Sequence, residues 1–250
     1  MTADDERSFQ KLASVTAILS APVAYAGEYF GFTAIAFDPT AFSEPGTLIA
    51  LGTEGAALFW WDWRLILFGY YLLVAPAVVF LWYWLRPKRP LSVTLVTLSG
   101  LAYVAFGALG AAINAAVWPE LMIEYAQAGP EQQAVLETVF STLAATVAIG
   151  VWGILNRIVS AVWWIGIGAL LRSERRSLGW FTLIVGVFSA IAAVGNLLEV
   201  APLTGLGTMG FLLLAPLWAL WLGVDLWRRP VDSGEIRADE PTPGATEAAR

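Results

Sequence analysis

Six long apolar stretches run through this chain, and the segments that join them alternate in charge. One set is basic and comprises residues 86–89, 172–176 and 228–229. The other set is acidic, with Glu28, Asp38, Glu44, Glu54 and Asp62 in its first segment, Glu120, Glu124, Glu131 and Glu137 in its second, and Glu199 in its last. Cytoplasmic loops of membrane proteins retain Lys and Arg, whereas acidic loops translocate freely. The alternation therefore predicts six membrane crossings with both termini in the cytoplasm.

Composition supports a membrane location. The 250 residues are 58% hydrophobic and 14% charged, with a mean hydropathy of +0.67, whereas soluble domains are about a quarter charged. The 13 Trp residues suit the aromatic belts where membrane meets water. We therefore expect an all-α, six-helix, multi-pass protein of the cell membrane, surrounded by the lipid bilayer. No basic patch is large enough to predict nucleic-acid binding.

The residue types that are missing exclude several chemistries. The chain has no Cys and no His, which excludes disulfides, thiol catalysis, His-ligated haem and Ser–His proteolysis. The two lysines, Lys11 and Lys88, are both expected near the cytoplasmic face. No lysine is therefore available for a Schiff base in the middle of the membrane. We predict no metal site, no cofactor and no catalytic residues. An intramembrane enzyme that uses a carboxylate is the least favoured function.

Hydropathy predicts a membrane domain over residues 12–229, between a cytoplasmic N-terminal segment (1–11) and a disordered cytoplasmic tail (230–250). The tail is rich in Pro, Gly, Thr and acids. We expect residues 28–63 to form an external loop, and Trp118-Pro119 to close the third crossing. The crossings themselves are predicted at residues 12–27, 64–85, 91–117, 148–171, 178–198 and 206–227.

The first crossing has an alternative interpretation. Ala24-Tyr25-Ala26 before Gly27 resembles a signal-peptidase site. The leading segment carries Asp4, Asp5 and Glu6, however, where a signal peptide needs positive charge. We therefore expect a retained first helix.

Arg157 is the single charge in the 34 residues between Glu137 and Arg172. Two crossings with a loop would need more residues and would place residues 172–176 outside, so we expect one long fourth helix. Counting at about 1.5 Å per residue places Arg157 about 22 Å above Arg172, in the outer third of the bilayer. Other polar residues of similar depth complete a candidate buried polar or substrate-binding cluster: Arg157, Glu28, Glu199, Asn196, Asn156 and Asn114.

A charge within hydrocarbon is costly, so we predict that Arg157 faces the interior and pairs with Glu28 or Glu199. Such a pair could be purely structural, Arg157 could instead extend towards the outer surface, or the cluster could bind a substrate or gate a pathway. Two further pairs are expected at the interfaces, Asp62 with Arg64 and Asp225 with an arginine nearby, Arg228.

Residues 170–191 read Leu-Leu-Arg-Ser-Glu-Arg-Arg-Ser-Leu-Gly-Trp-Phe-Thr-Leu-Ile-Val-Gly-Val-Phe-Ser-Ala-Ile. This basic turn, with its Leu178-Gly179-Trp180 opening and Gly186 in the following span, resembles the bacterial multi-pass membrane family catalogued as domain-of-unknown-function 4386. The resemblance implies a helical bundle in a bacterial membrane, and it implies no site residues.

Two functions remain open at this point. The absence of His and Cys favours a non-catalytic membrane component, such as a subunit, assembly factor or sensor that contacts a membrane-protein partner or a second copy of itself. The alternative is a small transporter or channel with a polar site around Arg157. Pro76 and Pro216, each in the middle of an apolar stretch, suit that alternative because proline interrupts transmembrane helices.

Overall fold

The computed structural model describes residues 3–38, 41–42 and 44–229, and all the regular structure there is helical. The predicted tail, residues 230–250, lies outside the described residues. The elements are α1 (Ala3–Ala34), α2 (Pro45–Ile49), α3 (Gly52–Ile66), η2 (Leu67–Leu72), α4 (Ala75–Leu85), α5 (Pro90–Gln127), α6 (Pro130–Ala145), η3 (Thr146–Asn156), α7 (Arg157–Leu171), α8 (Arg176–Leu197) and α9 (Ala201–Arg228).

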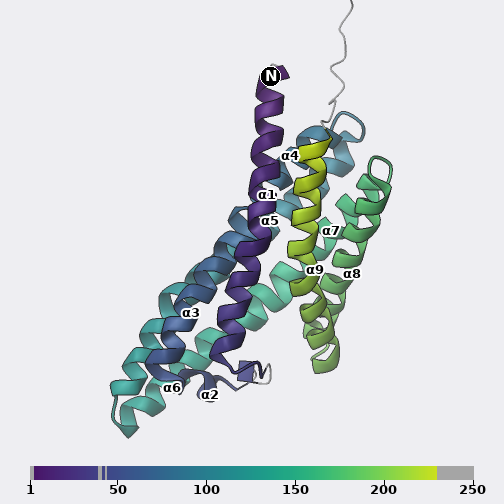
Figure 1. The fold of residues 1–250 in the computed structure, drawn as a ribbon. Helices are drawn as coiled ribbons and strands as arrows, with labels where there is room; N and C mark the ends of the chain where they lie inside the picture. Colours follow the sequence, from purple (N-terminus) through teal and green to yellow (C-terminus); the bar gives the residue numbers. More distant parts are fainter. Residues whose placement is uncertain (1–2, 39–40, 43, 230–250) are drawn as a thin grey trace, which may run out of the picture.

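Several elements join end to end into longer helices. Segments α3, η2 and α4 form one interrupted helix, Gly52–Leu85, and α6, η3 and α7 form a 42-residue helix, Pro130–Leu171, where one long helix was expected. These two helices, α5, α8 and α9 are long and apolar enough to cross a membrane. Helix α1 is not among these five, although it runs beside α9 along the bundle (Figure 1).

The expected external loop at residues 28–63 is wrong, because most of it is helical. Helix α1 continues to Ala34 and α3 begins at Gly52, so only a short connection containing α2 separates them. The polar residues that suggested a loop are accommodated by close helix contact instead. A Cβ on Gly27 or Gly31 of α1 would lie 3.0 Å from Ile66 or 2.8 Å from Asp62 of α3. Small residues four apart allow two helix backbones to approach in this way.

Helix α5 does not end at Pro119, as the sequence suggested, but continues to Gln127. Proline lacks the N–H that would bond the carbonyl four residues earlier, which here is that of Ala115. The Arg64 guanidinium donates a hydrogen bond to this carbonyl oxygen at 3.3 Å. A side chain from α3 thus compensates for the missing backbone donor.

The six long helices pack in a closed ring. Helix α1 contacts α3, α3 contacts α5, α5 contacts α7, α7 contacts α8, α8 contacts α9, and α9 returns to α1. Aromatic rings fill much of the interior: Trp164 and Trp218 have ring centroids 4.4 Å apart, and Trp163 stacks on Tyr103 at 5.8 Å. The small residue Gly100 leaves room for Trp163, since a Cβ there would lie 2.5 Å from its ring.

The basic turns gather at one end of the bundle, together with the start of α1 and the end of α9 (Figure 1). Lys88 in the α4–α5 turn bonds Glu174 in the α7–α8 turn at 2.6 Å. Arg175 bonds Asp225 at 2.9 Å, and Arg229 lies 3.7 Å from the same carboxylate. Asp225 therefore pairs with Arg175 and Arg229, and not with Arg228 as expected.

Candidate functional site

Arg157 lies where the π-helical segment η3 gives way to α7. π-helical segments inside α-helices are frequently found at functional sites. The Arg157 guanidinium carbon lies 4.3 Å from the ring centroid of Phe211 on α9. The side chain thus faces α9 in a cation–π contact.

The predicted ion pair of Arg157 with Glu28 or Glu199 is not formed. Among the described residues the ion pairs within 4 Å are those of Lys88, Arg175 and Arg229. Glu199 lies in the α8–α9 turn, exposed, with a φ of +56°. Glu28 is close enough to Arg157 for electrostatic attraction, but not for direct contact. Depth along the helix axis was a poor guide here because the rotation of each helix decides which side chains meet.

Three tyrosines surround the region between Glu28 and Arg157. The Tyr70 hydroxyl donates to the Leu212 carbonyl at 2.8 Å, and the Tyr103 hydroxyl donates to the Tyr70 carbonyl at 2.9 Å. Tyr71 packs so closely on α5 that a Cβ on Gly107 would lie 1.9 Å from its ring. The three rings contact one another, with Tyr71 and Tyr103 centroids 5.4 Å apart.

The predicted asparagines fall into different environments. Asn156 is buried and donates to the Tyr103 carbonyl at 2.8 Å, so it belongs to the tyrosine region. Asn196 donates to Ala192 of its own helix at 2.8 Å, and its side chain rests against Gly153 of η3. Asn114 is buried, and its Oδ1 has no hydrogen-bond donor among the described residues.

Asp62 is the site residue that the sequence interpretation missed. It was expected to pair with Arg64 at an interface, but Arg64 lies over the Trp60 ring at 3.8 Å and Asp62 points the other way. Asp62 is only 2% exposed and rests against Gly31 of α1. Its Oδ1 has no hydrogen-bond donor among the described residues. The Gly27-x-x-x-Gly31 spacing was the available signal that α1 and α3 approach closely at this level.

Asp62 and Glu28 interact across the α1–α3 contact. Glu28 lies within electrostatic range of Asp62, and Glu28 Oε1 likewise has no hydrogen-bond donor among the described residues. We refer to Asp62 and Glu28 as the acid pair. Two like charges in a low-dielectric interior repel, so a buried acid pair is suited to binding a proton. Tyr70 lies beside Glu28, and because its own proton goes to Leu212, it is free to accept one from a protonated Glu28.

A small cavity of about 10 Å³ adjoins this region, with room for about one water molecule. Its lining includes Ser20, Tyr70, Tyr103 and Pro216. Further along the bundle, the Ser160 and Ser189 hydroxyls lie within hydrogen-bonding distance of each other and of the Arg157 carbonyl, so one hydroxyl can donate to the carbonyl while the other donates to its neighbour. The interior thus offers a series of hydroxyl and carboxyl groups with space for a proton or a water, rather than for an organic solute.

Comparisons with known proteins found no matching family model, no matching curated protein and no matching solved structure.

Proposed function

We propose that this protein is a small membrane transporter or channel that carries protons, with the acid pair as its proton-binding site. Asp62 and Glu28 carry the proposal, since each has a buried carboxylate oxygen, Oδ1 of Asp62 and Oε1 of Glu28, to which no described residue donates a hydrogen bond. Ionisable residues within membrane helices are expensive, and they commonly mark ion pathways and proton relays. Arg157 would attract the charge left on Glu28 when the proton leaves.

The proposal includes six crossings of a bacterial cell membrane, with the basic end of the bundle in the cytoplasm. Helix α1 serves as the sixth crossing. Its polar side chains bond the backbone of α9, with Gln10 donating to Leu226 at 2.6 Å, Ser14 to Gly223 at 2.6 Å and Tyr25 to Leu213 at 2.5 Å. Polar side chains satisfied in this way lower hydropathy without exposing unbonded groups to lipid. Kinship with domain-of-unknown-function 4386 is part of the same proposal.

Proton flux into vesicles tests the site. The purified protein is reconstituted into liposomes that contain a pH-sensitive dye, and a membrane potential is imposed. We expect wild-type flux above that of protein-free vesicles, and a return to that baseline in Asp62→Asn and Glu28→Gln. Glu124→Gln changes an exposed acid on α5 and should leave flux unchanged. Wild-type vesicles no faster than protein-free ones would refute proton transport, and full flux in Asp62→Asn would refute this site.

A second candidate function rests on the fourth long helix, Pro130–Leu171. Only 22% of its apolar stretch is buried, against 39–50% in the other four crossing helices. Between its exposed aliphatic residues, such as Val135, Val139 and Ile149, the outer half of this helix also exposes a run of small or hydroxylated side chains, Thr138, Thr142, Ala145, Thr146, Ala148 and Gly150. The exposed positions of α5 near the basic end include the leucines Leu91, Leu95 and Leu98. Small residues favour helix–helix packing over lipid contact, which suits a membrane component that assembles with a transmembrane helix of a partner protein.

Single cysteines test this second candidate cleanly, because the chain has none of its own. A photo-crosslinker is attached to Ala145→Cys, and to Leu98→Cys as the matched lipid-facing control, in native membranes. We expect a heavier adduct containing one defined membrane protein from position 145, and none from position 98. Identical adducts from both positions would reflect random collisions and would remove this candidate.

A further inference from the structure

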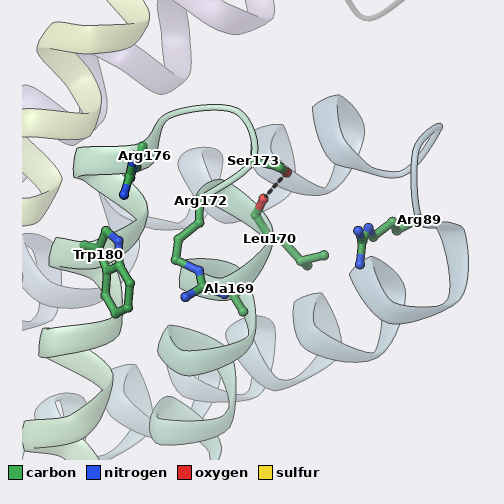
Figure 2. Close-up of a pocket in the computed structure, with 7 residues that line it drawn as sticks. All are labelled: Arg89, Ala169, Leu170, Arg172, Ser173, Arg176 and Trp180. Atoms are coloured by element: carbon green, nitrogen blue, oxygen red, sulfur yellow. Dashed lines mark hydrogen bonds between the residues drawn. The ribbon is translucent and has the colours of Figure 1, made fainter.

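An open depression of about 510 Å³ lies at the basic end of the bundle, between the α4–α5 turn and the α7–α8 turn. Three arginines line it: Arg89, Arg172 and Arg176 (Figure 2). The rest of the lining is Ala169, Leu170, Ser173 and Trp180. Its volume lies in the range of ordinary ligand pockets. We call it the arginine pocket.

Within the part of the chain that the structure describes, the arginines of this pocket have no carboxylate partner. The acidic side chains of the neighbouring segments are taken by other cations: Glu174 by Lys88 at 2.6 Å, and Asp225 by Arg175 at 2.9 Å. The Lys88–Glu174 pair also joins the α4–α5 turn to the α7–α8 turn, and these are the turns next to Arg89 and Arg172. None of Arg89, Arg172 and Arg176 takes part in the ion pairs of the described residues. The pocket therefore presents three uncompensated positive charges.

The geometry favours an anion that carries several oxygens. Figure 2 shows Arg89 extending towards Leu170 from one side, with Arg172, Arg176 and Trp180 on the other side of Leu170. Arginine forks match phosphate oxygens bidentately. Arg176 also begins α8, a 22-residue helix whose first amides have no acceptor within the helix and so add positive potential.

Apolar surface continues from the pocket into the membrane. Trp180, on the pocket wall, is 50% exposed, with the Arg172 guanidinium 4.8 Å from its ring centroid. Further along the same helices the exposed residues are aliphatic: Leu91, Leu95 and Leu98 on α5, and Ile184 and Val187 on α8. A free anion would make no contact with this apolar surface, whereas the acyl chains of a lipid can pack against it.

We infer that the arginine pocket binds the phosphate of an anionic glycerophospholipid, with the lipid tails lying on the exposed aliphatic faces of α5 and α8. The head group would bridge the α4–α5 and α7–α8 turns and so fix the basic end of the bundle to the membrane surface. Basic pockets between transmembrane helices recognise lipid head groups by this chemistry.

Native mass spectrometry of the full chain tests the site, after reconstitution in nanodiscs of phosphatidylcholine with phosphatidylglycerol. We expect retained phosphatidylglycerol on the wild type. Each arginine removed should weaken binding about fivefold, the factor that ~1 kcal/mol per basic residue gives, and the double variant Arg172→Gln/Arg176→Gln about 25-fold. The matched control, Arg86→Gln/Arg228→Gln, removes two cations of the same end that do not line the pocket.

Two outcomes would overturn the inference. Equal loss in the control pair would show that the charge of the whole end attracts lipid without a defined pocket. Inorganic phosphate that displaces phosphatidylglycerol from the wild type would show that the pocket binds a free anion instead. Melting temperatures of all variants in phosphatidylcholine alone, expected to match the wild type, show that lost binding is not lost folding.

Discussion

The Tyr70 hydroxyl donates a 2.8 Å hydrogen bond to the carbonyl of Leu212, four residues before Pro216 in α9. This is the carbonyl that Pro216 leaves without its helical N–H donor. The Arg64 guanidinium serves the Ala115 carbonyl in the same way, four residues before Pro119. In lipid an unpaired backbone group is expensive, so Pro119 and Pro216 are tolerated inside their helices because a neighbouring helix supplies the missing donor.

Removing the Tyr70 hydroxyl should therefore destabilise the bundle in a way that removing the proline can rescue. We expect Tyr70→Phe to lower the free energy of unfolding by about 1–2 kcal/mol, measured by SDS titration in mixed micelles. In a Pro216→Ala background the alanine N–H can bond Leu212, so the same change should cost much less. Equal costs in the two backgrounds would contradict the assigned role of Tyr70.

The glycines at helix contacts should tolerate alanine very unequally. A Cβ at Gly69 would lie 2.4 Å from the backbone nitrogen of Ala24 on α1, which cannot rotate away. We expect Gly69→Ala to cost about 1–3 kcal/mol of unfolding free energy. Gly150→Ala is the matched control, since no atom lies within 4 Å of its Cβ position. It should be neutral or stabilising by up to about 1 kcal/mol, and a similar loss in both would argue against α1 packing on η2.

Phe211 contacts the Arg157 guanidinium through a cation–π interaction. The aromatic ring should therefore contribute more to the free energy of unfolding than an aliphatic side chain would. We expect Phe211→Leu to lower the free energy of unfolding by about 1–3 kcal/mol, from lost packing and lost cation–π attraction. In an Arg157→Met background, where no charge remains, the same substitution should cost about 1 kcal/mol less. Identical costs in both backgrounds would show that the ring acts by packing alone.

Two acidic residues at the basic end, Asp225 and Glu174, should differ in their contribution to stability. Asp225 has a side chain 12% exposed and contacts two arginines, whereas the exposed Lys88 is the single ion-pair partner of Glu174 among the described residues. We expect Asp225→Asn to cost about 1–3 kcal/mol and Glu174→Gln at most about 1 kcal/mol. Thermal unfolding in detergent at low and high salt measures both, and a larger effect at Glu174 would reverse the assignment.

The sequence anticipated the helical class, the long fourth helix and the gathering of basic turns, because these follow from composition and linear charge pattern. It also identified Arg157 as an unusual interior cation. It placed the ends of α1, α3 and α5 wrongly, because hydropathy detects the apolar centre of a helix but not its polar ends. Asp62 was assigned to an interface for the same reason. From the linear sequence alone, a charge beside Trp60 and Trp61 suggests an exposed position at the membrane surface.

The sequence by itself thus determined that the chain is a helical membrane protein and which of its turns share an end. Partitioning of apolar residues and the distribution of Lys and Arg suffice for that, since both act along the chain. Only the tertiary structure decided that Asp62 is buried within electrostatic range of Glu28, that Arg157 lies on Phe211 and that three arginines line one pocket. These contacts depend on how each helix is rotated and how closely its glycines let a neighbour approach, and helix packing sets both.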